Sequence, residues 1–280
     1  MKLRVATCMT LPEVDVDEAP LAEALRRAGI DAELLAWDDP KVDWSRPIPT
    51  VLRSTWNYAQ DLPGFLAWID RVSAVAPLVN PREVVRANVY KRYLLELAAP
   101  GVGVVPTTII EQGYTADLAA IAATYGTEHL VIKPEVGAGS LGTRVFTQVT
   151  DSAYDHLEIL TTRGAALIQP YLASVDDYGE RSLVWIDGQL SHAIRKAPRF
   201  SGDAESVTGP HPIADDERAL AEAALAPYAA HILYGRVDMA RDAANRPVVM
   251  ELEMTEPSLF FAKQPGSADR FVAGLRARIA

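Results

Sequence analysis

The sequence predicts an α/β protein in which an amino-terminal lobe of alternating strands and helices precedes two lobes built on antiparallel sheets. The apolar opening LRVATCM, followed by the amphipathic segment APLAEALRRAGI, indicates a strand that leads into a helix. Further along, RSLVWI and QLSHAI flank Asp187-Gly188, a strong signal for a two-residue β-hairpin. A content of 49% hydrophobic and 23% charged residues is typical of a packed globular chain.

The first lobe, residues 1–82, continues the alternation of strands and helices. In its first helix Leu21, Ala24 and Leu25 recur at helical spacing until Gly29 ends the pattern. The segments AELLAW and TVLRS predict two more strands, and GFLAWIDRVSAV predicts a second amphipathic helix. We therefore expect an α/β domain here.

The two remaining lobes are expected over residues 83–170 and 171–280. The middle lobe begins with a helical stretch, REVVRANVYKRYLLELAA, and then alternates strands and helices up to LIQPY. The last lobe contains the Asp187-Gly188 hairpin and a second antiparallel pair, RVDMAR with PVVMELEM. A long helix, DDERALAEAALAPYAAHILY, is predicted between these two hairpins. The loop near residues 199–212 is the best candidate for mobility and could act as a lid.

Charge and composition exclude several classes of partner. The net charge of −10, spread along the chain, argues against binding to nucleic acid. The sequence has no apolar run long enough to cross a membrane and no signal sequence at its amino terminus, so we expect a cytoplasmic protein. The single cysteine, Cys8, is expected to be a buried thiol and not a nucleophile. A small-molecule partner remains, and a homo-oligomer is compatible with the sequence.

Residues 137–142 read GAGSLG and lie between the strand-like segments HLVIKP and TRVFTQV. Because the G-x-G-x-x-G pattern of dinucleotide-binding proteins requires a helix after the glycines, a Rossmann-type oxidoreductase is the least favoured function. A flexible loop between antiparallel strands could instead lay its N–H groups over phosphates. The residues concerned are Gly137, Gly139, Ser140 and Gly142, with Lys133 as a nearby point charge. Taken alone, the segment is equally compatible with an ordinary glycine-rich turn beside a surface lysine.

Three acidic residues follow near the carboxy terminus. Asp238 lies on RVDMAR, and the spacing of Glu251 and Glu253 puts both on one face of a strand. Carboxylates that converge in a shallow cluster suit Mg²⁺, which bridges to nucleotide phosphates. By themselves the two glutamates are also compatible with the solvent face of an edge strand, but their position after a phosphate-type loop favours a metal site. Between loop and acids, LIQPYL could provide an apolar slot and backbone hydrogen bonds for a base.

In this order Lys91, Lys133 with GAGSLG, LIQPYL, Arg195, Asp238 and the two glutamates resemble the ATP-grasp superfamily over residues from about 80 to 260. The resemblance implies a two-lobed module whose antiparallel sheets clamp the nucleotide, with a substrate-side domain before it. It also implies ATP and Mg²⁺ as cofactors. One departure is that the usual glutamate-x-asparagine metal motif appears here as Glu251-Leu252-Glu253.

The resemblance also implies roles for individual residues. Lys91 and Lys133 would contact phosphates, and Asp238, Glu251 and Glu253 would hold magnesium. The adenine would be held by Gln169, Pro170, Tyr171 and Leu172, and the ribose by Asp176 or Glu180.

At finer grain, WDDPKVDW, LRSTWNY, QPYLASVDDYGERSLVWIDGQLSHAIRK and LEMTEPSLFF resemble the branch that contains the cyclo-ligase of D-cycloserine biosynthesis. That enzyme closes O-ureido-D-serine into a ring. Two alternatives stay open: an intermolecular amino-acid or dipeptide ligase, and a non-catalytic ATP-binding regulatory module.

The expected ligase reaction passes through an acylphosphate, which a nitrogen nucleophile then attacks. Arg195, together with Lys133, is the candidate for stabilising the transferring phosphoryl group or the later oxyanion. Lys196 is expected to point to the opposite face of the strand. Arg53, which follows a strand of the first lobe, is the candidate for binding the substrate carboxylate, and Thr55 and Trp56 could complete that wall. The amine end of a small polar substrate could be oriented by residues that follow the metal strand, namely Thr255, Glu256 and Ser258. Trp56 and Tyr58 are equally compatible with packing roles.

Overall fold

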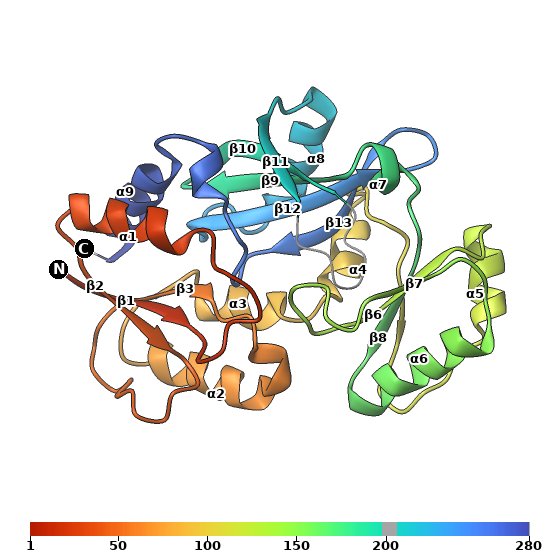
Figure 1. Cartoon of the computed structure of the whole chain (residues 1–280), viewed down its shortest axis with the longest axis horizontal. Coiled ribbons are helices and arrows are strands. Elements are labelled where there is room, and N and C mark those ends of the chain that lie inside the picture. Colours follow the sequence, from red (N-terminus) through yellow and green to blue (C-terminus); the bar gives the residue numbers. More distant parts are fainter. Residues whose placement is uncertain (198–205, 280) are drawn as a thin grey trace.

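The computed structural model describes residues 1–197 and 206–279 and contains three sheets (Figure 1). The first sheet is parallel, in the order β2-β1-β3-β4. Its strands are β1 (Lys2–Thr7), β2 (Asp31–Ala36), β3 (Thr50–Ser54) and β4 (Leu78–Val79). The crossovers contain α1 (Glu18–Arg27), the short η1 (Tyr58–Gln60) and α2 (Leu62–Ser73). The predicted α/β lobe is confirmed.

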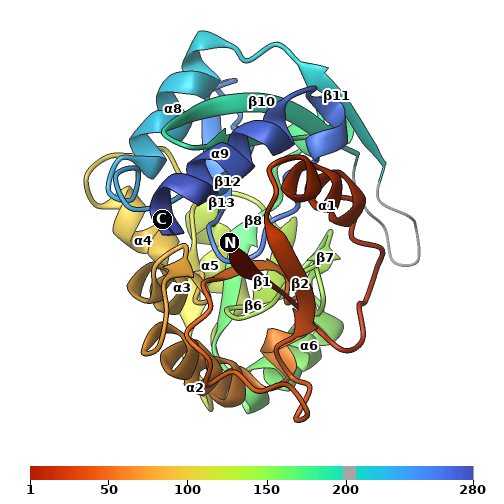
Figure 2. The same ribbon diagram turned by 90° about the vertical axis from the view of Figure 1, so that its left-hand side faces the viewer.

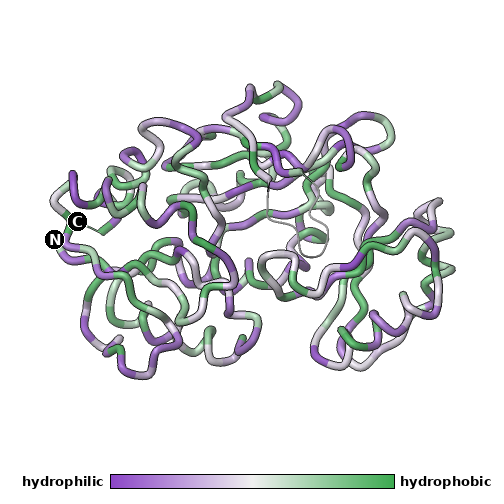
Figure 3. The backbone as a smooth tube through the Cα atoms, in the orientation of Figure 1, coloured by the Kyte–Doolittle hydropathy of each residue, from purple (hydrophilic) through white to green (hydrophobic). Residues whose placement is uncertain are grey.

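The second sheet is antiparallel, in the order β5-β8-β6-β7. It contains β5 (Thr108–Ile110), β6 (Leu130–Pro134), β7 (Arg144–Phe146) and β8 (Ala166–Pro170), with α5 (Leu118–Tyr125) and α6 (Asp151–Arg163) against it. Leu130, Ile132 and Ile168 pack with Leu118 and Leu157 of the helices in one buried cluster. Hydrophobic stretches alternate with hydrophilic ones along the chain here as elsewhere (Figure 3).

The third sheet is antiparallel, in the order β11-β10-β9-β12-β13. Its strands are β9 (Glu180–Ile186), β10 (Gln189–Lys196), β11 (Val207–His211), β12 (Tyr234–Arg241) and β13 (Pro247–Glu253). Around it lie α7 (Ser174–Asp177), α8 (Asp215–Leu225), η2 (Phe261–Lys263) and α9 (Ser267–Ile279). Both predicted hairpins are present, and Asp187 and Gly188 have φ values of 47° and 84°, as the tight turn requires.

The single helix predicted from REVVRANVYKRYLLELAA is wrong, because the structure has two: α3 (Arg82–Asn88) and α4 (Tyr93–Ala98). Hydrogen bonds to residues far along the chain stabilise the break between α3 and α4. The Asn88 amide donates to the Leu252 carbonyl at 2.7 Å and accepts from the Met254 N–H at 2.6 Å. The Lys91 N–H donates to the Glu135 carbonyl at 3.1 Å. The break places Lys91 on a turn beside the third sheet.

Two further expectations about the last lobe need correction. The long helix is shorter than predicted, because α8 ends at Leu225, two residues before Pro227, which cannot continue a helix. The segment predicted as a mobile loop over residues 199–212 includes β11, which pairs with β10. The rest of that prediction falls on residues 198–205, which lie outside the described residues.

The last helix returns to the first lobe. Figure 2 shows α9 beside α1, and both pack into one core in which Leu25 and Val5 lie with Tyr234, Phe271 and Leu275. The first and third sheets therefore share a core, while the boundaries proposed near residues 82 and 170 stay predictions. Within the described residues, no helix is both long and apolar enough to span a membrane.

Candidate active site

A cavity of about 290 Å³ is lined by residues of the second and third sheets, together with Trp56 and Tyr58, which follow β3 of the first sheet. Most of the residues singled out in the sequence line it: Trp56, Lys91, Lys133, Gly137, Gly139, Ser140, Gln169, Pro170, Tyr171, Leu172, Glu180, Asp238, Glu251, Glu253, Thr255, Glu256 and Ser258. Five do not line it: Arg53, Thr55, Gly142, Asp176 and Arg195. Lys196 and Arg236, which were not expected to serve the site, also line it, and so does Tyr58, for which binding and packing were both left open.

The glycine-rich loop joins β6 to β7, which pair antiparallel, so the two-strand context predicted for it is confirmed. Gly139 and Ser140 both have left-handed backbone conformations, with φ of 61° and 59°. At the start of the loop Val136 and Ala138 pack against the aromatic core of the first lobe. Gly142 points its carbonyl away, where it bonds with Nε2 of His156 at 3.0 Å.

Lys91 and Lys133 bring two ammonium groups to Glu251. The Lys91 Nζ lies 3.1 Å from the carboxylate and also donates to the Gly137 carbonyl at 2.6 Å, whereas the Lys133 Nζ lies 4.0 Å from the carboxylate. Burial acts to lower the pKa of Lys91, but Glu251 outweighs it and the net shift is upward. Burial lowers the pKa of Lys133, and repulsion from Lys91 adds to the shift. The two lysines therefore share one counter-ion and favour further negative charge between them.

Lys196, and not Arg195, faces the cavity. Its Nζ donates to Glu180 at 2.8 Å and to Asp238 at 2.9 Å. Arg195 lies on the other face of β10, is exposed and donates to the Asp177 carbonyl. Arg195 and Lys196 point to opposite faces of the strand, as predicted, but the prediction of which one faces the cavity is wrong. A register shift between Leu190 and His192 interrupts the β9–β10 ladder and exchanges the two faces.

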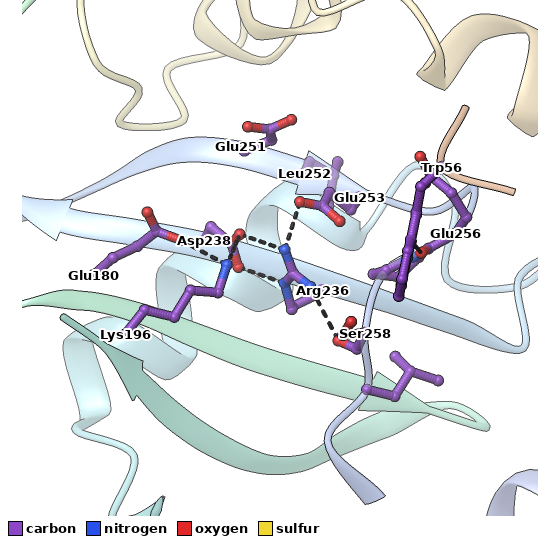
Figure 4. A network of polar contacts seen from close by, with 12 residues as sticks. Trp56, Glu180, Lys196, Arg236, Asp238, Glu251, Leu252, Glu253, Glu256 and Ser258 are labelled. Carbon is purple, nitrogen blue, oxygen red and sulfur yellow. Dashed lines mark hydrogen bonds and ion pairs between the residues drawn. The ribbon is translucent and has the colours of Figure 1, made fainter. Parts of the chain in front are cut away.

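The Arg236 guanidinium is held in place by hydrogen bonds to several acceptors. Its Nε and Nη2 donate to the two Asp238 oxygens, both at 2.8 Å, and Nη2 also donates to Glu253 at 2.5 Å. Nη1 donates to the Ser258 carbonyl at 3.0 Å. Figure 4 shows this network with Lys196 on the other side of Asp238. Because Arg236 and Asp238 are two apart on β12, they share one strand face, and this spacing could have identified Arg236 from the sequence.

The shifts of the acidic groups follow from this network. Burial would raise the pKa of Asp238, but Arg236 and Lys196 hold it well below its usual range. Burial raises the pKa of Glu253 to about 8 although Arg236 opposes the shift, and the charges of Asp238 and Glu251 add to the rise. Glu251 has a lowered pKa because Lys91 and Lys133 together overcome the effect of burial.

The three acids do not converge as predicted. Among residues 1–197 and 206–279, no three acidic, histidine or cysteine side chains are close enough to enclose a metal ion. Asp238 and Glu251 are direct cross-strand partners on β12 and β13, but each carboxylate is neutralised by protein cations instead. Hard oxygen donors on neighbouring strands of one cavity still fit Mg²⁺, which uses one or two carboxylates and completes its shell with phosphates and water.

The LIQPYL segment, in which β8 ends, and the acidic residue Glu180 lie at one end of the cavity. Gln169 to Leu172 line it, and the Tyr171 ring stacks on His129 with centroids 4.1 Å apart. Glu180 also lines it, whereas Asp176 is exposed and accepts a hydrogen bond from the Tyr171 hydroxyl at 2.5 Å. Of the two acids proposed for a ribose, the structure therefore brings only Glu180 to the cavity.

Arg53 and Thr55 do not reach the cavity. Arg53 is buried, and its Nη2 donates to Asp17 at 3.2 Å and to the Pro257 carbonyl at 2.8 Å. Asp17 in turn accepts the N–H groups of Leu259 and Phe261, at 2.5 and 2.8 Å. The expectation that Arg53 binds a substrate carboxylate is wrong, because this arginine instead anchors the segment after β13. Thr55 is fully buried.

The opposite end of the cavity is formed by Trp56, Tyr58 and the segment after β13. The Trp56 indole N–H donates to the Glu256 carbonyl oxygen at 3.0 Å. The Thr255 hydroxyl points to Asn88 Oδ1 at 3.3 Å, and Ser258 lines the wall. Burial raises the pKa of Glu256 to about 7. Tyr58 stacks on Phe65 with centroids 5.1 Å apart, so it combines packing with a position in the cavity wall.

Comparisons with known proteins match this fold and site. The family model described as the D-cycloserine synthetase DcsG N-terminal domain matches residues 3–80. The cycloserine biosynthesis protein DcsG of Streptomyces lavendulae is 39% identical over an alignment of 294 positions, which covers 98% of this chain and 97% of that protein. The crystal structure of D-cycloserine synthetase DcsG covers 100% of both chains with a TM-score of 0.91 and 38% identity.

A more distant likeness concerns the fold. A structure of the ATP-grasp ligase PsnB, complexed with a minimal precursor, has a TM-score of 0.68 at 19% identity and covers 99% of both chains. Together with the closer match, it confirms the predicted ATP-grasp architecture of antiparallel sheets beside an α/β lobe.

Proposed function

This chain belongs to the D-cycloserine synthetase family of ATP-grasp ligases, and we propose that it uses ATP and Mg²⁺ to cyclise O-ureido-D-serine into D-cycloserine. The observation that carries the proposal is the set of four cations, Lys91, Lys133, Lys196 and Arg236, that line one cavity between a strand exit and a substrate-side wall. Four cations opposite carboxylates suit a reaction in which negative charge gathers during phosphoryl transfer.

In the first step a carboxylate oxygen of the substrate attacks the γ-phosphorus of ATP, the bond to ADP breaks, and an acylphosphate forms. Lys91 and Lys133 would bind the phosphates, because both ammonium groups lie beneath the glycine-rich loop and share only Glu251. Arg236 takes the role first assigned to Arg195. Its planar guanidinium is held rigidly by Asp238 and is therefore oriented before the substrate binds.

At the nucleotide end, Gln169 to Leu172 would receive the adenine and Glu180 the ribose hydroxyls. Asp238 and Glu251 would hold Mg²⁺, which supplies positive charge to phosphate oxygens during transfer. In binding it they would release their lysine partners, so Lys91 and Lys196 become available to phosphate.

In the second step the nitrogen bound to the side-chain oxygen attacks the acyl carbon, and inorganic phosphate leaves. The ring then carries the carbamoyl group of the ureido moiety on its nitrogen. Hydrolysis of that group, with one water, releases carbon dioxide and ammonia and leaves D-cycloserine. Arg236 or Lys196 would donate to the oxyanion formed during attack.

The test is release of ADP and phosphate with ATP and Mg²⁺, with products identified by mass spectrometry. We expect release with O-ureido-D-serine alone, together with D-cycloserine in equal amount. Release only when two separate amino acids are supplied would replace the cyclo-ligase with an intermolecular ligase. Binding of ATP without release under any of these conditions would support a regulatory module instead.

A further inference from the structure

Glu256 differs from the acids of the phosphate-binding region in that it has no ion pair with any described residue. Glu180 and Asp238 pair with Lys196, Glu251 pairs with Lys91, and Glu253 pairs with Arg236. Glu256 is only 6% exposed and lines the same cavity. A buried carboxylate without an ion-pair partner is costly, and a positive group on the ligand that pairs with it would offset that cost.

We propose that Glu256 and Tyr58 form a subsite that binds the α-ammonium group of a free amino acid, so that this ligase acts only on substrates with an unmodified amine. The inference rests on the proposed function, since it assumes that the cavity holds a substrate carboxylate beside the phosphates. It adds the residues that select the free amine. Of the three residues expected at the amine end, it retains Glu256 alone, because the Thr255 hydroxyl is directed at Asn88.

Three side chains donate hydrogen bonds to the backbone of the segment that carries Glu256. Trp56 donates to the carbonyl of Glu256 itself, Arg53 to that of Pro257 at 2.8 Å and Arg236 to that of Ser258 at 3.0 Å. Three consecutive carbonyls are thus held by three buried or partly buried donors. The carboxylate is therefore held in place before the ligand arrives, which favours binding of a small charged group.

Tyr58 supplies the second contact. Its ring is held by stacking on Phe65, and Tyr58 is only 4% exposed, yet no hydrogen bond among the described residues involves its hydroxyl. Tyr58 and Glu256 line the same cavity, and Trp56, two residues before Tyr58, donates to the Glu256 carbonyl at 3.0 Å, so the two segments lie side by side. An ammonium group has three N–H donors, so it can bond to both the carboxylate and the hydroxyl oxygen.

The position of the subsite matches the chemistry of an α-amino acid. Figure 4 shows Glu180 and Glu256 at opposite ends of the group of side chains, with Asp238 and Arg236 between them. In an α-amino acid only one carbon separates the ammonium from the carboxylate. An ammonium on Glu256 therefore directs the carboxylate toward Arg236, which also contacts Ser258, two residues after Glu256. An N-acylated substrate would present a neutral amide to Glu256 and leave its charge unpaired.

The experiment measures ADP release by wild type, Glu256→Gln, Tyr58→Phe and Glu180→Gln. The substrates are O-ureido-D-serine, a panel of free D- and L-amino acids singly and in pairs, and the N-acetyl derivative of each compound that responds. For Glu256→Gln we expect the KM for the amino acid to rise about 10- to 100-fold and the KM for ATP to stay within about threefold. Glu180→Gln is the matched control, with the same charge change at the nucleotide end and the opposite pattern. Tyr58→Phe, which keeps the ring stacking, should raise the KM for the amino acid about fivefold.

The outcomes separate this inference from the proposed function. If O-ureido-D-serine gives no ADP release but another free amino acid does, and the N-acetyl derivative of that amino acid does not, the cyclo-ligase is wrong and the ammonium subsite stands. If the N-acetyl derivative of any active compound reacts as well as the free amine, or Glu256→Gln leaves the KM for the amine unchanged, the subsite is wrong whichever substrate is used. If none of the free amino acids drives ADP release, the proposed function and the ammonium subsite are both wrong.

Discussion

The Lys196 ammonium reaches across β9 to the Asp238 carboxylate on β12, at 2.9 Å, and so joins the hairpin β9–β10 to the strand that carries Arg236. The same ammonium holds Glu180 at 2.8 Å. One lysine therefore connects the acid proposed for the ribose with the acid proposed for the metal.

Lys196→Met should lower kcat by at least about 100-fold, because it removes a buried cation from the region where phosphoryl charge develops. Its neighbour provides the matched control: Arg195→Met removes an exposed cation outside the cavity and should change kcat by no more than about threefold. Both are measured by ADP release, well below the melting temperature of each variant. Loss of activity in the Arg195 variant with a fully active Lys196 variant would reverse the assignment.

Glu180→Gln should raise the KM for ATP about 10- to 100-fold, as expected when a charged hydrogen-bond acceptor is lost. Asp176→Asn should leave that KM within about threefold, because Asp176 is exposed and bonded to the Tyr171 hydroxyl. Initial rates over a range of ATP concentrations measure both. An equal rise in the two variants would mean that the ribose is not bound by Glu180 alone.

Arg53→Met should destabilise the protein by about 3 to 5 kcal/mol, because it leaves the Asp17 carboxylate buried without its partner. Urea unfolding measures the change. Arg71→Met serves as the control, since Arg71 is exposed and has no ion pair among the described residues, and it should change the free energy of unfolding by less than about 0.5 kcal/mol. A stable Arg53 variant with a raised KM for the amino acid would restore the substrate role first expected for this residue.

His192 should make stability depend on pH. Burial lowers its pKa from 6.5 to about 4, so the unfolded chain binds this proton at a higher pH than the folded protein does. Its contribution is fully present above pH 6.5 and is lost as the pH falls toward 4. Between pH 7 and pH 5, wild type should lose about 2 kcal/mol more than His192→Gln in urea unfolding. Equal losses in the two proteins would show that His192 does not titrate in this way.

The sequence was most informative where local chemistry decides the structure. The Asp187-Gly188 turn, the strands around GAGSLG and the helical spacing of Leu21 and Leu25 each follow from a few adjacent residues. The break between α3 and α4 could not be predicted in this way, because Asn88 is bonded to residues more than 160 positions away. Local helix propensity indicates one helix, and tertiary hydrogen bonds divide it.

In the site, too, some features follow from local sequence patterns and others depend on tertiary contacts. The acids and lysines that line the cavity are on motifs that the sequence displays, and Arg236 could have been added from its spacing to Asp238. The choice between Arg195 and Lys196 depends on a register shift within β10, which no local pattern indicates. Arg53 looked available for substrate because it follows a strand, but Asp17, which pairs with it, lies 36 residues earlier and becomes its neighbour only in the folded chain.

The central claim is that this chain activates a carboxylate by phosphorylating it, and isotope transfer tests it most directly. O-ureido-D-serine labelled with ¹⁸O in both carboxylate oxygens is converted with ATP and Mg²⁺, and the released phosphate is analysed by mass spectrometry. An acylphosphate requires that one labelled oxygen leave with the phosphorus, so each phosphate released should carry one ¹⁸O. Unlabelled phosphate, formed while the ring product accumulates, would contradict the account.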